Sequence, residues 1–183
     1  MHPAFSIIFL TTLIGVGQGL FLALYSGQLY SVFGLLPANV PLHFYALGSL
    51  LALLFLVAGL ASSFFHLGRP ERAWRSAARW RTSWMSREVI VLPAFMGSVA
   101  VWGLIHFIGW NPVLFTIRDT FAVDLSALTG AVATLLCFAL FLCTGMIYAC
   151  LKMLQEWATP LTVANYILFG SASGFLLATS YAA

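Results

Sequence analysis

The chain alternates between long apolar stretches and short polar linkers. A helix needs about 20 consecutive apolar residues to cross the hydrocarbon core, whereas a barrel strand needs about ten residues of alternating polarity. The apolar stretches here are longer than barrel strands and do not alternate, so the pattern predicts helices. The expected fold class is therefore all-α, a polytopic transmembrane bundle in one membrane domain over residues 1–183. The expected spans are approximately residues 3–30, 41–67, 88–110, 125–151 and 160–182.

Capping and breaking residues support these boundaries. Pro112 follows the third stretch, and Asp124 and Ser126 are candidate N-caps for the fourth. Thr159-Pro160 can open the fifth stretch, with the proline in the first helical turn. Small residues inside the first and fifth stretches predict close helix contacts in the membrane. These residues are Gly15, Gly17, Gly19, Gly170, Ser171, Ser173 and Gly174.

Composition agrees with a membrane protein. Of the residues, 62% are hydrophobic and 7% are charged, whereas soluble domains carry about 25% charged residues. The net charge of +3 comes from one cluster rather than from a basic domain, so we expect no nucleic-acid partner. Cys137, Cys143 and Cys150 lie in one apolar run without CxxC spacing. We therefore expect small buried residues there, and neither a disulfide nor a metal site.

The charges are concentrated in residues 66–88, which we call the arginine island. The island holds six of the eight Lys and Arg residues. With five spans, the island and the 152–159 linker share one side of the membrane, and that side carries seven basic residues against one on the other. The positive-inside rule then places the island and the N-terminus in the cytoplasm and the C-terminus outside. We therefore expect a multi-pass membrane protein in contact with lipids, with the island on the cytoplasmic side.

The arginines of the island have several possible roles. They can set topology, contact lipid phosphates or dock an acidic partner protein. Arg72, Arg75 and Arg79 share a face if this segment is helical, and tryptophans are interleaved with them. Part of the island is therefore expected to be an amphipathic helix on the membrane surface.

Two titratable residues stand at the ends of the island. His66 closes the second span, where an imidazole can hydrogen-bond a carbonyl and exchange a proton near neutral pH. Glu88 opens the third span and can accept protons there, although an acid at a helix start can also serve as a cap. An interfacial histidine satisfied by backbone or water is the alternative reading of His66.

Other polar residues fall inside or at the ends of spans. Gln18 lies deep in the first span, where it can bond a neighbouring helix or a ligand. Asn165 is expected to be buried in the fifth span and to need a partner. Tyr148 and Lys152 lie one turn apart at the inner end of the fourth span, where the lysine can reach the interface.

Two further histidines raise the possibility of a b-type heme. His43 and His106 fall near the external ends of the second and third spans. Histidines on facing helices can ligate heme iron. Both positions are close to the interface, however, and neither has a matching histidine on another helix. We therefore expect no heme in this chain.

The island also carries a recognisable motif. HLGxPxxA over residues 66–73, followed by SxE over 86–88, resembles the signature of membrane-anchor subunits of DMSO-reductase-type molybdoenzymes, the DmsC family. Gln18, within GVGQG, also resembles a family position. The segment from Met146 to Gly170 resembles the branch of anchors of sulfite-oxidising or related molybdoenzymes.

This resemblance implies a function. Such anchors hold a ferredoxin-like iron–sulfur subunit and a molybdopterin catalytic subunit on the membrane, and they bind ubiquinone or menaquinone without a heme or metal of their own. The implied quinone-binding residues are His66, Glu88, Gln18, Ser86, Tyr148 and Lys152. The implied partner-docking residues are Arg69, Arg72, Arg75, Arg79 and Arg81. No catalytic residue is expected in this chain itself.

The chain departs from the family pattern in one respect. Family anchors usually have eight spans and this sequence offers five, so we expect a partial chain or a short form. A purely structural anchor and a b-type cytochrome subunit remain alternatives to the quinone-binding anchor. A transporter is the least favoured reading, because the spans show no inverted repeat.

Overall fold

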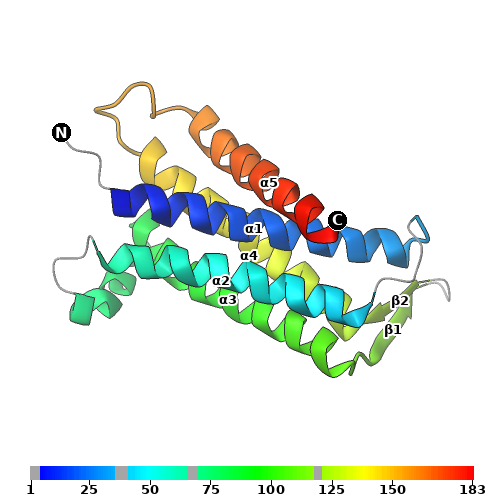
Figure 1. The fold of residues 1–183 in the computed structure, drawn as a ribbon. Helices are drawn as coiled ribbons and strands as arrows, with labels where there is room; N and C mark the ends of the chain where they lie inside the picture. Colours follow the sequence, from blue (N-terminus) through cyan, green and yellow to red (C-terminus); the bar gives the residue numbers. More distant parts are fainter. Residues whose placement is uncertain (1–4, 36–40, 66–69, 118–120) are drawn as a thin grey trace.

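Five long helices dominate the computed structural model, which describes residues 5–35, 41–65, 70–117 and 121–183. All five are long and apolar enough to cross a membrane, which confirms the all-α polytopic fold class. They are α1 (Phe5–Val32), α2 (Leu42–Phe64), α3 (Trp84–Ile108), α4 (Leu125–Ala149) and α5 (Pro160–Ala182), shown in Figure 1.

Helix α3 begins earlier than the sequence pattern indicated. The hydroxyl of Ser83 accepts a hydrogen bond from the backbone N–H of Ser86 at 3.4 Å, so the helix starts at Trp84. Glu88 therefore lies in the second turn, and the expectation that it opens the helix or caps it was wrong. Asp124 caps α4 as expected, with its carboxylate accepting from the N–H of Ala127 at 2.7 Å.

The linkers contain two short elements. The arginine island includes a 3₁₀ helix, η1 (Pro70–Arg79), and the 111–124 linker contains an antiparallel pair, β1 (Val113–Ile117) and β2 (Phe121–Asp124). The hairpin was not expected, but its β-branched and aromatic residues favour strands. Residues three apart align in a 3₁₀ helix, so Arg72 and Arg75 share a face while Arg79 is offset from them.

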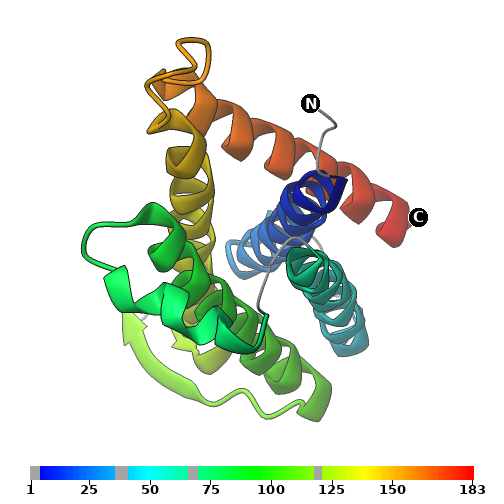
Figure 2. The ribbon, with the colours of Figure 1, turned by 90° about the vertical axis from the view of Figure 1, so that its left-hand side faces the viewer.

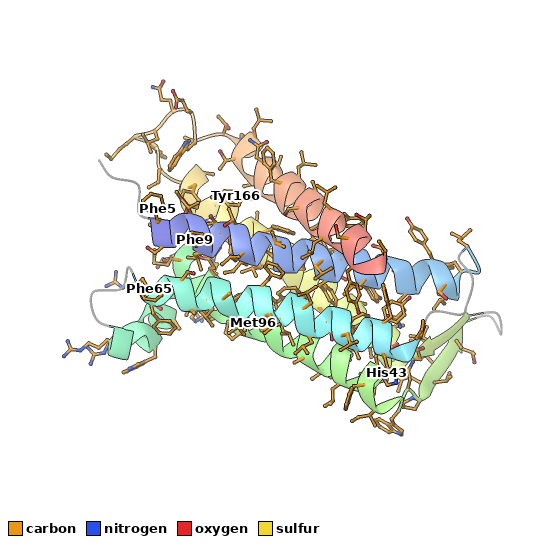
Figure 3. All side chains as sticks on the ribbon, in the orientation of Figure 1. Phe5, Phe9, His43, Phe65, Met96 and Tyr166 are labelled. Atoms are coloured by element: carbon orange, nitrogen blue, oxygen red, sulfur yellow. The ribbon has the colours of Figure 1, made fainter. Side chains whose placement is uncertain are left out.

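The bundle has two distinct ends. Figure 1 shows η1, the start of α1, the start of α3 and the α4–α5 loop at one end, which we call the island end, and the hairpin at the other, which we call the hairpin end. Figure 3 places Phe65 at the island end and His43 at the hairpin end. The arrangement is the one that five antiparallel spans require, with the second and fourth linkers on the same side.

Helix α1 lies at the centre of the bundle. It packs mainly on α2 and α5, while α3 packs on α4 and α2 (Figure 2). Phe21 of α1 makes edge-to-face contacts with Phe95 and Trp102 of α3, at ring separations of 5.6 and 5.5 Å. At the crossing of α1 and α5, a Cβ added to Gly19 would overlap the carbonyl oxygen of Gly170. The predicted small-residue contact between these helices is confirmed.

A buried polar network joins α1, α3 and α4 near the hairpin end. The indole of Trp102 donates to Gln28 at 3.0 Å, and Gln28 donates to Ser126 at 2.5 Å. His106 is buried beside them, with its Nδ1 2.9 Å from the carbonyl oxygen of Trp102. These mutual hydrogen bonds satisfy polar groups that would be costly to bury alone.

The three cysteines do not share one environment. Cys137 and Cys143 are buried, as expected, but Cys150 is exposed because it caps the C-terminal end of α4. The expectation of burial was therefore wrong for Cys150.

Candidate functional site

A cavity of about 420 Å³ opens between α1, α4 and α5. Glu88 of α3 also contributes to its wall. The lining consists of Leu10, Thr11, Thr12, Ile14, Gly15, Val16, Gln18, Glu88, Phe141, Thr144, Asn165, Tyr166, Phe169, Gly170 and Ser173. We call this cavity the α1–α5 pocket. Pockets that bind small molecules typically measure about 300–1,000 Å³, so the volume suits a ligand.

The α1–α5 pocket lies mostly in the island-end half of the bundle. Its α1 residues all precede the middle of that helix, and its α4 residues lie in the last third. Phe169 forms part of the wall near the middle of α5 and is 74% exposed. This edge of the pocket therefore opens at the side of the five-helix bundle.

Glu88 is the acidic group of the pocket lining. It is partly buried in the second turn of α3, and the hydroxyl of Thr144 on α4 donates to its Oε1 at 2.5 Å. The bond fixes the carboxyl group across the α3–α4 contact, and among the described residues it is the hydrogen bond found for this side chain. Thr144 therefore holds the Glu88 carboxyl group in a defined position at the pocket wall.

Gln18 occupies the inner wall of the pocket. It is 2% exposed, and its Nε2 donates to the backbone carbonyl of Cys137 on α4 at 3.0 Å. The helix-to-helix hydrogen bond considered for this residue is therefore present. Gln18 also lines the cavity, so the same side chain bonds a neighbouring helix and borders the space where a ligand could bind.

Tyr166 brings an aromatic ring to the pocket from α5. Figure 3 shows its position where α5 passes beside α1 near the island end. Its ring stacks on that of Tyr148 of α4, with centroids 5.5 Å apart and planes at 16°. Asn165, the preceding residue, also lines the pocket but is exposed, so the expectation that it would be buried was wrong.

The other hydroxyl groups of the lining are already engaged. Thr11, Thr12 and Ser173 donate to carbonyl oxygens of their own helices, at 3.1, 2.7 and 3.0 Å. The remaining lining is largely apolar, with a few polar groups at defined positions. This combination suits a flat amphipathic ligand with a polar head and an apolar body.

The residues predicted for the site do not all meet there. Gln18 and Glu88 line the α1–α5 pocket, and Tyr148 stacks behind Tyr166. Ser86 is buried at the start of α3 and is absent from the described lining, and Lys152 is exposed on the α4–α5 loop. His66 lies outside the described residues.

Sequence reasoning did not identify Thr144 and Tyr166. Both can be found from topology, because α4 ends and α5 begins at the same face as Glu88. Polar residues within two turns of that face are the ones a five-span arrangement brings together. Thr144 lies outside the motifs, and the resemblance of the Met146–Gly170 segment did not single out Tyr166. Their side chains could therefore be grouped only after the helix ends had been placed.

The arginine island presents charge at the same end. Arg72, Arg75, Arg79 and Arg81 are exposed, as a docking role requires, and Arg69 lies outside the described residues. Trp74 and Trp80 are 71% and 53% exposed, and Arg75 and Arg81 lie over their rings. Arg87 has a local role instead, because it donates to the carbonyl oxygens of Trp80 and Arg81, both at 2.9 Å.

Comparisons with known proteins agree with the resemblance in the sequence motifs. The model of the family described as "DMSO reductase anchor subunit (DmsC)" matches residues 1–182. The chain is also 60% identical over 183 residues to a sulfite dehydrogenase subunit of Allochromatium vinosum. The alignment covers all of this chain but 56% of that relative, so the chain spans little more than half of its length. No solved structure matches the chain.

Proposed function

The chain belongs to the DMSO reductase anchor subunit (DmsC) family, and from this premise we propose that it is the quinone-binding membrane anchor of a molybdopterin and iron–sulfur oxidoreductase. The α1–α5 pocket is the proposed quinone site. One observation carries the proposal: a carboxyl group held by Thr144 faces an otherwise largely apolar cavity in the island-end half of the bundle.

The pocket suits the chemistry of a quinone head group. A quinone ring is flat and apolar, with two carbonyl oxygens that become hydroxyl groups on reduction. The apolar side chains of Ile14, Phe141 and Phe169 would contact the ring or its tail. The open edge beside Phe169 would let the long tail pass to the side of the bundle.

The polar residues have separate proposed roles. Glu88 would exchange a proton with one quinone oxygen, and Thr144 would hold the carboxyl group in position. The Gln18 and Tyr166 side chains would orient the head group. His66 remains a candidate to contact the second quinone oxygen, and this assignment rests only on its position in the sequence motif. The bound quinone supplies the two-electron redox chemistry, while the protein supplies binding and proton exchange.

The arginine island provides the proposed docking surface. Arg69, Arg72, Arg75, Arg79 and Arg81 would contact a ferredoxin-like iron–sulfur subunit, which in turn would hold a molybdopterin catalytic subunit. Because the pocket and the exposed arginines lie toward the same end, an iron–sulfur cluster docked there would be near the quinone. The charge bias supports a cytoplasmic location for this end, in the bacterial inner membrane of our proposal.

Replacing Glu88 tests the proposal. In the intact complex, we expect Glu88→Gln to lower quinone-linked turnover by at least about 100-fold, because a proton-exchanging group typically contributes that much. Turnover of the catalytic subunit with an artificial dye should stay unchanged. Glu156→Gln, on the exposed α4–α5 loop, is the matched control. Quinone-linked turnover equal to that of the unaltered complex would exclude Glu88 from the site.

A further inference from the structure

The α4–α5 loop is linked to the α1–α5 pocket by a series of aromatic rings. Trp157 of the loop packs edge-on against Tyr148, with centroids 5.5 Å apart and planes at 74°. Tyr148 stacks on Tyr166, which lines the pocket. Neither Trp157 nor Tyr148 is among the described lining residues. The rings therefore run from a partly exposed loop to the pocket wall.

The loop is built to hold Trp157 in place. The carbonyl oxygen of Trp157 accepts from the N–H of Thr159 at 2.8 Å and from the hydroxyl of Thr162 at 2.7 Å. Its own N–H donates to the carbonyl oxygen of Leu154 at 2.9 Å. These bonds tie the residue to the first turn of α5, so the indole ring has a fixed anchor although it is 43% exposed.

Tyr166 has few fully buried neighbours on its own helix, because α5 is the least buried of the five helices. Within its apolar window 11% of residues are buried, against 33–44% in the others. The described residues of α5 buried in the bundle are Gly170 and Gly174, which provide no side chain to hold the tyrosine ring. The stacked face of Tyr148 is therefore a principal constraint on the orientation of Tyr166.

We propose that Trp157 and Tyr148 are positioning residues for the quinone, which hold the ring of Tyr166 against the head group. Trp157 is then a positioning residue of the quinone site, although the loop that carries it lies outside the pocket. This inference rests on the proposed quinone-binding function. It gives a role to a loop that the motif of the arginine island does not include.

Removing the outermost ring tests the inference. In the intact complex, Trp157→Leu should raise the KM for a short-tailed quinone by about two- to tenfold, because an aromatic pair contributes about 0.5–1.5 kcal/mol and 1.4 kcal/mol corresponds to tenfold. The probes are ubiquinone-1 and menaquinone-1, each measured separately. Dye-linked turnover should not change, and Trp157→Phe, which keeps a ring, should restore most of the affinity.

A double substitution separates positioning from a general structural role. If Trp157 acts through Tyr166, its effect should disappear in a Tyr166→Leu background, since coupled residues are not additive. Trp110→Leu is the matched control, because Trp110 is 65% exposed just beyond α3 at the hairpin end. Should Trp157→Leu fail to assemble, Tyr148→Leu removes the middle ring and carries the same expectation.

The outcomes distinguish this inference from the function on which it rests. An unchanged KM in Trp157→Leu, or an effect of equal size in the Tyr166→Leu background, overturns the positioning role and leaves the quinone site standing. Absence of quinone-linked turnover in the unaltered, dye-active complex overturns both.

Discussion

At the scale of single residues, the Glu88–Thr144 pair is the defining feature of the site. The two side chains come from different helices, and the hydroxyl donates to the carboxylate at 2.5 Å beside a largely apolar cavity. Thr144 is 7% exposed, so its hydroxyl has little access to water and its bond to Glu88 is worth more than one at a surface. A threonine inside a span thereby becomes part of the proposed proton-handling group.

Thr144→Val keeps the shape of this side chain and removes the hydroxyl group. We expect quinone-linked turnover to fall about two- to tenfold, because a hydrogen bond typically contributes about 0.5–1.5 kcal/mol and 1.4 kcal/mol corresponds to tenfold. Thr144→Ser retains the hydroxyl and should keep most of the activity.

Thr134→Val provides the control on the same helix, because the Thr134 hydroxyl donates within α4 to the carbonyl oxygen of Gly130. If quinone-linked turnover of Thr144→Val equals that of Thr134→Val, the Glu88 carboxyl group does not need the hydrogen bond from Thr144.

At the scale of elements, the crossing of α1 and α5 shapes the pocket. Gly15 and Gly19 of α1 meet Gly170 and Gly174 of α5 so closely that the helix backbones are in contact. This contact closes one end of the cavity, and Gly15 and Gly170 are part of its wall. Helices in lipid associate through such packing rather than through the hydrophobic effect.

Gly174→Ala should loosen this crossing. The added Cβ would overlap the backbone of Gly19 and Leu20, and backbone atoms cannot yield as a flexible side chain can. We expect a loss of about 1–3 kcal/mol in the free energy of unfolding, seen as a lower melting temperature in detergent.

Gly97→Ala on α3 is the comparison, because a Cβ there meets nothing within 4 Å and alanine favours the helix. A melting temperature for Gly174→Ala at or above that of Gly97→Ala would contradict the close packing.

The sequence predicted some elements well and others poorly, for physical reasons. Apolar length and the Asp124 cap located α4, and Thr159-Pro160 located the start of α5. The predicted start of α3 was a few residues too late. The segment Ser83–Arg87 contains polar residues and resembles a linker, but it belongs to the helix and its N-cap. The hairpin was missed because its strands occupy a linker too short to show a clear period.

The candidate site was predicted in part. Gln18 and Glu88 were found because polar groups in apolar stretches are conspicuous, and the structure brings both to one cavity. Tyr166 and Thr144 were missed because tyrosine and threonine are unremarkable in a span. Their importance depends on which helix ends meet, and that is a property of the fold rather than of any local pattern.

At the scale of the whole molecule, the two ends of the bundle differ in character. The hairpin end is joined by the Trp102–Gln28–Ser126 network, in which the polar groups bond one another. The island end combines exposed arginines, exposed tryptophans and the α1–α5 pocket. The hairpin end is thus stabilised by internal hydrogen bonds. The island end is, in our proposal, the place of partner docking and quinone binding.

Photoaffinity labelling of the intact complex tests the central claim most directly. A quinone analogue with an aryl azide on its head group would be bound, activated by light and located by mass spectrometry of the chain. The account predicts labelled peptides from residues 10–18, 141–144 and 165–173, with labelling suppressed by excess unmodified quinone. Suppressible labelling confined to the hairpin end, or no suppressible labelling of these three segments, would contradict it.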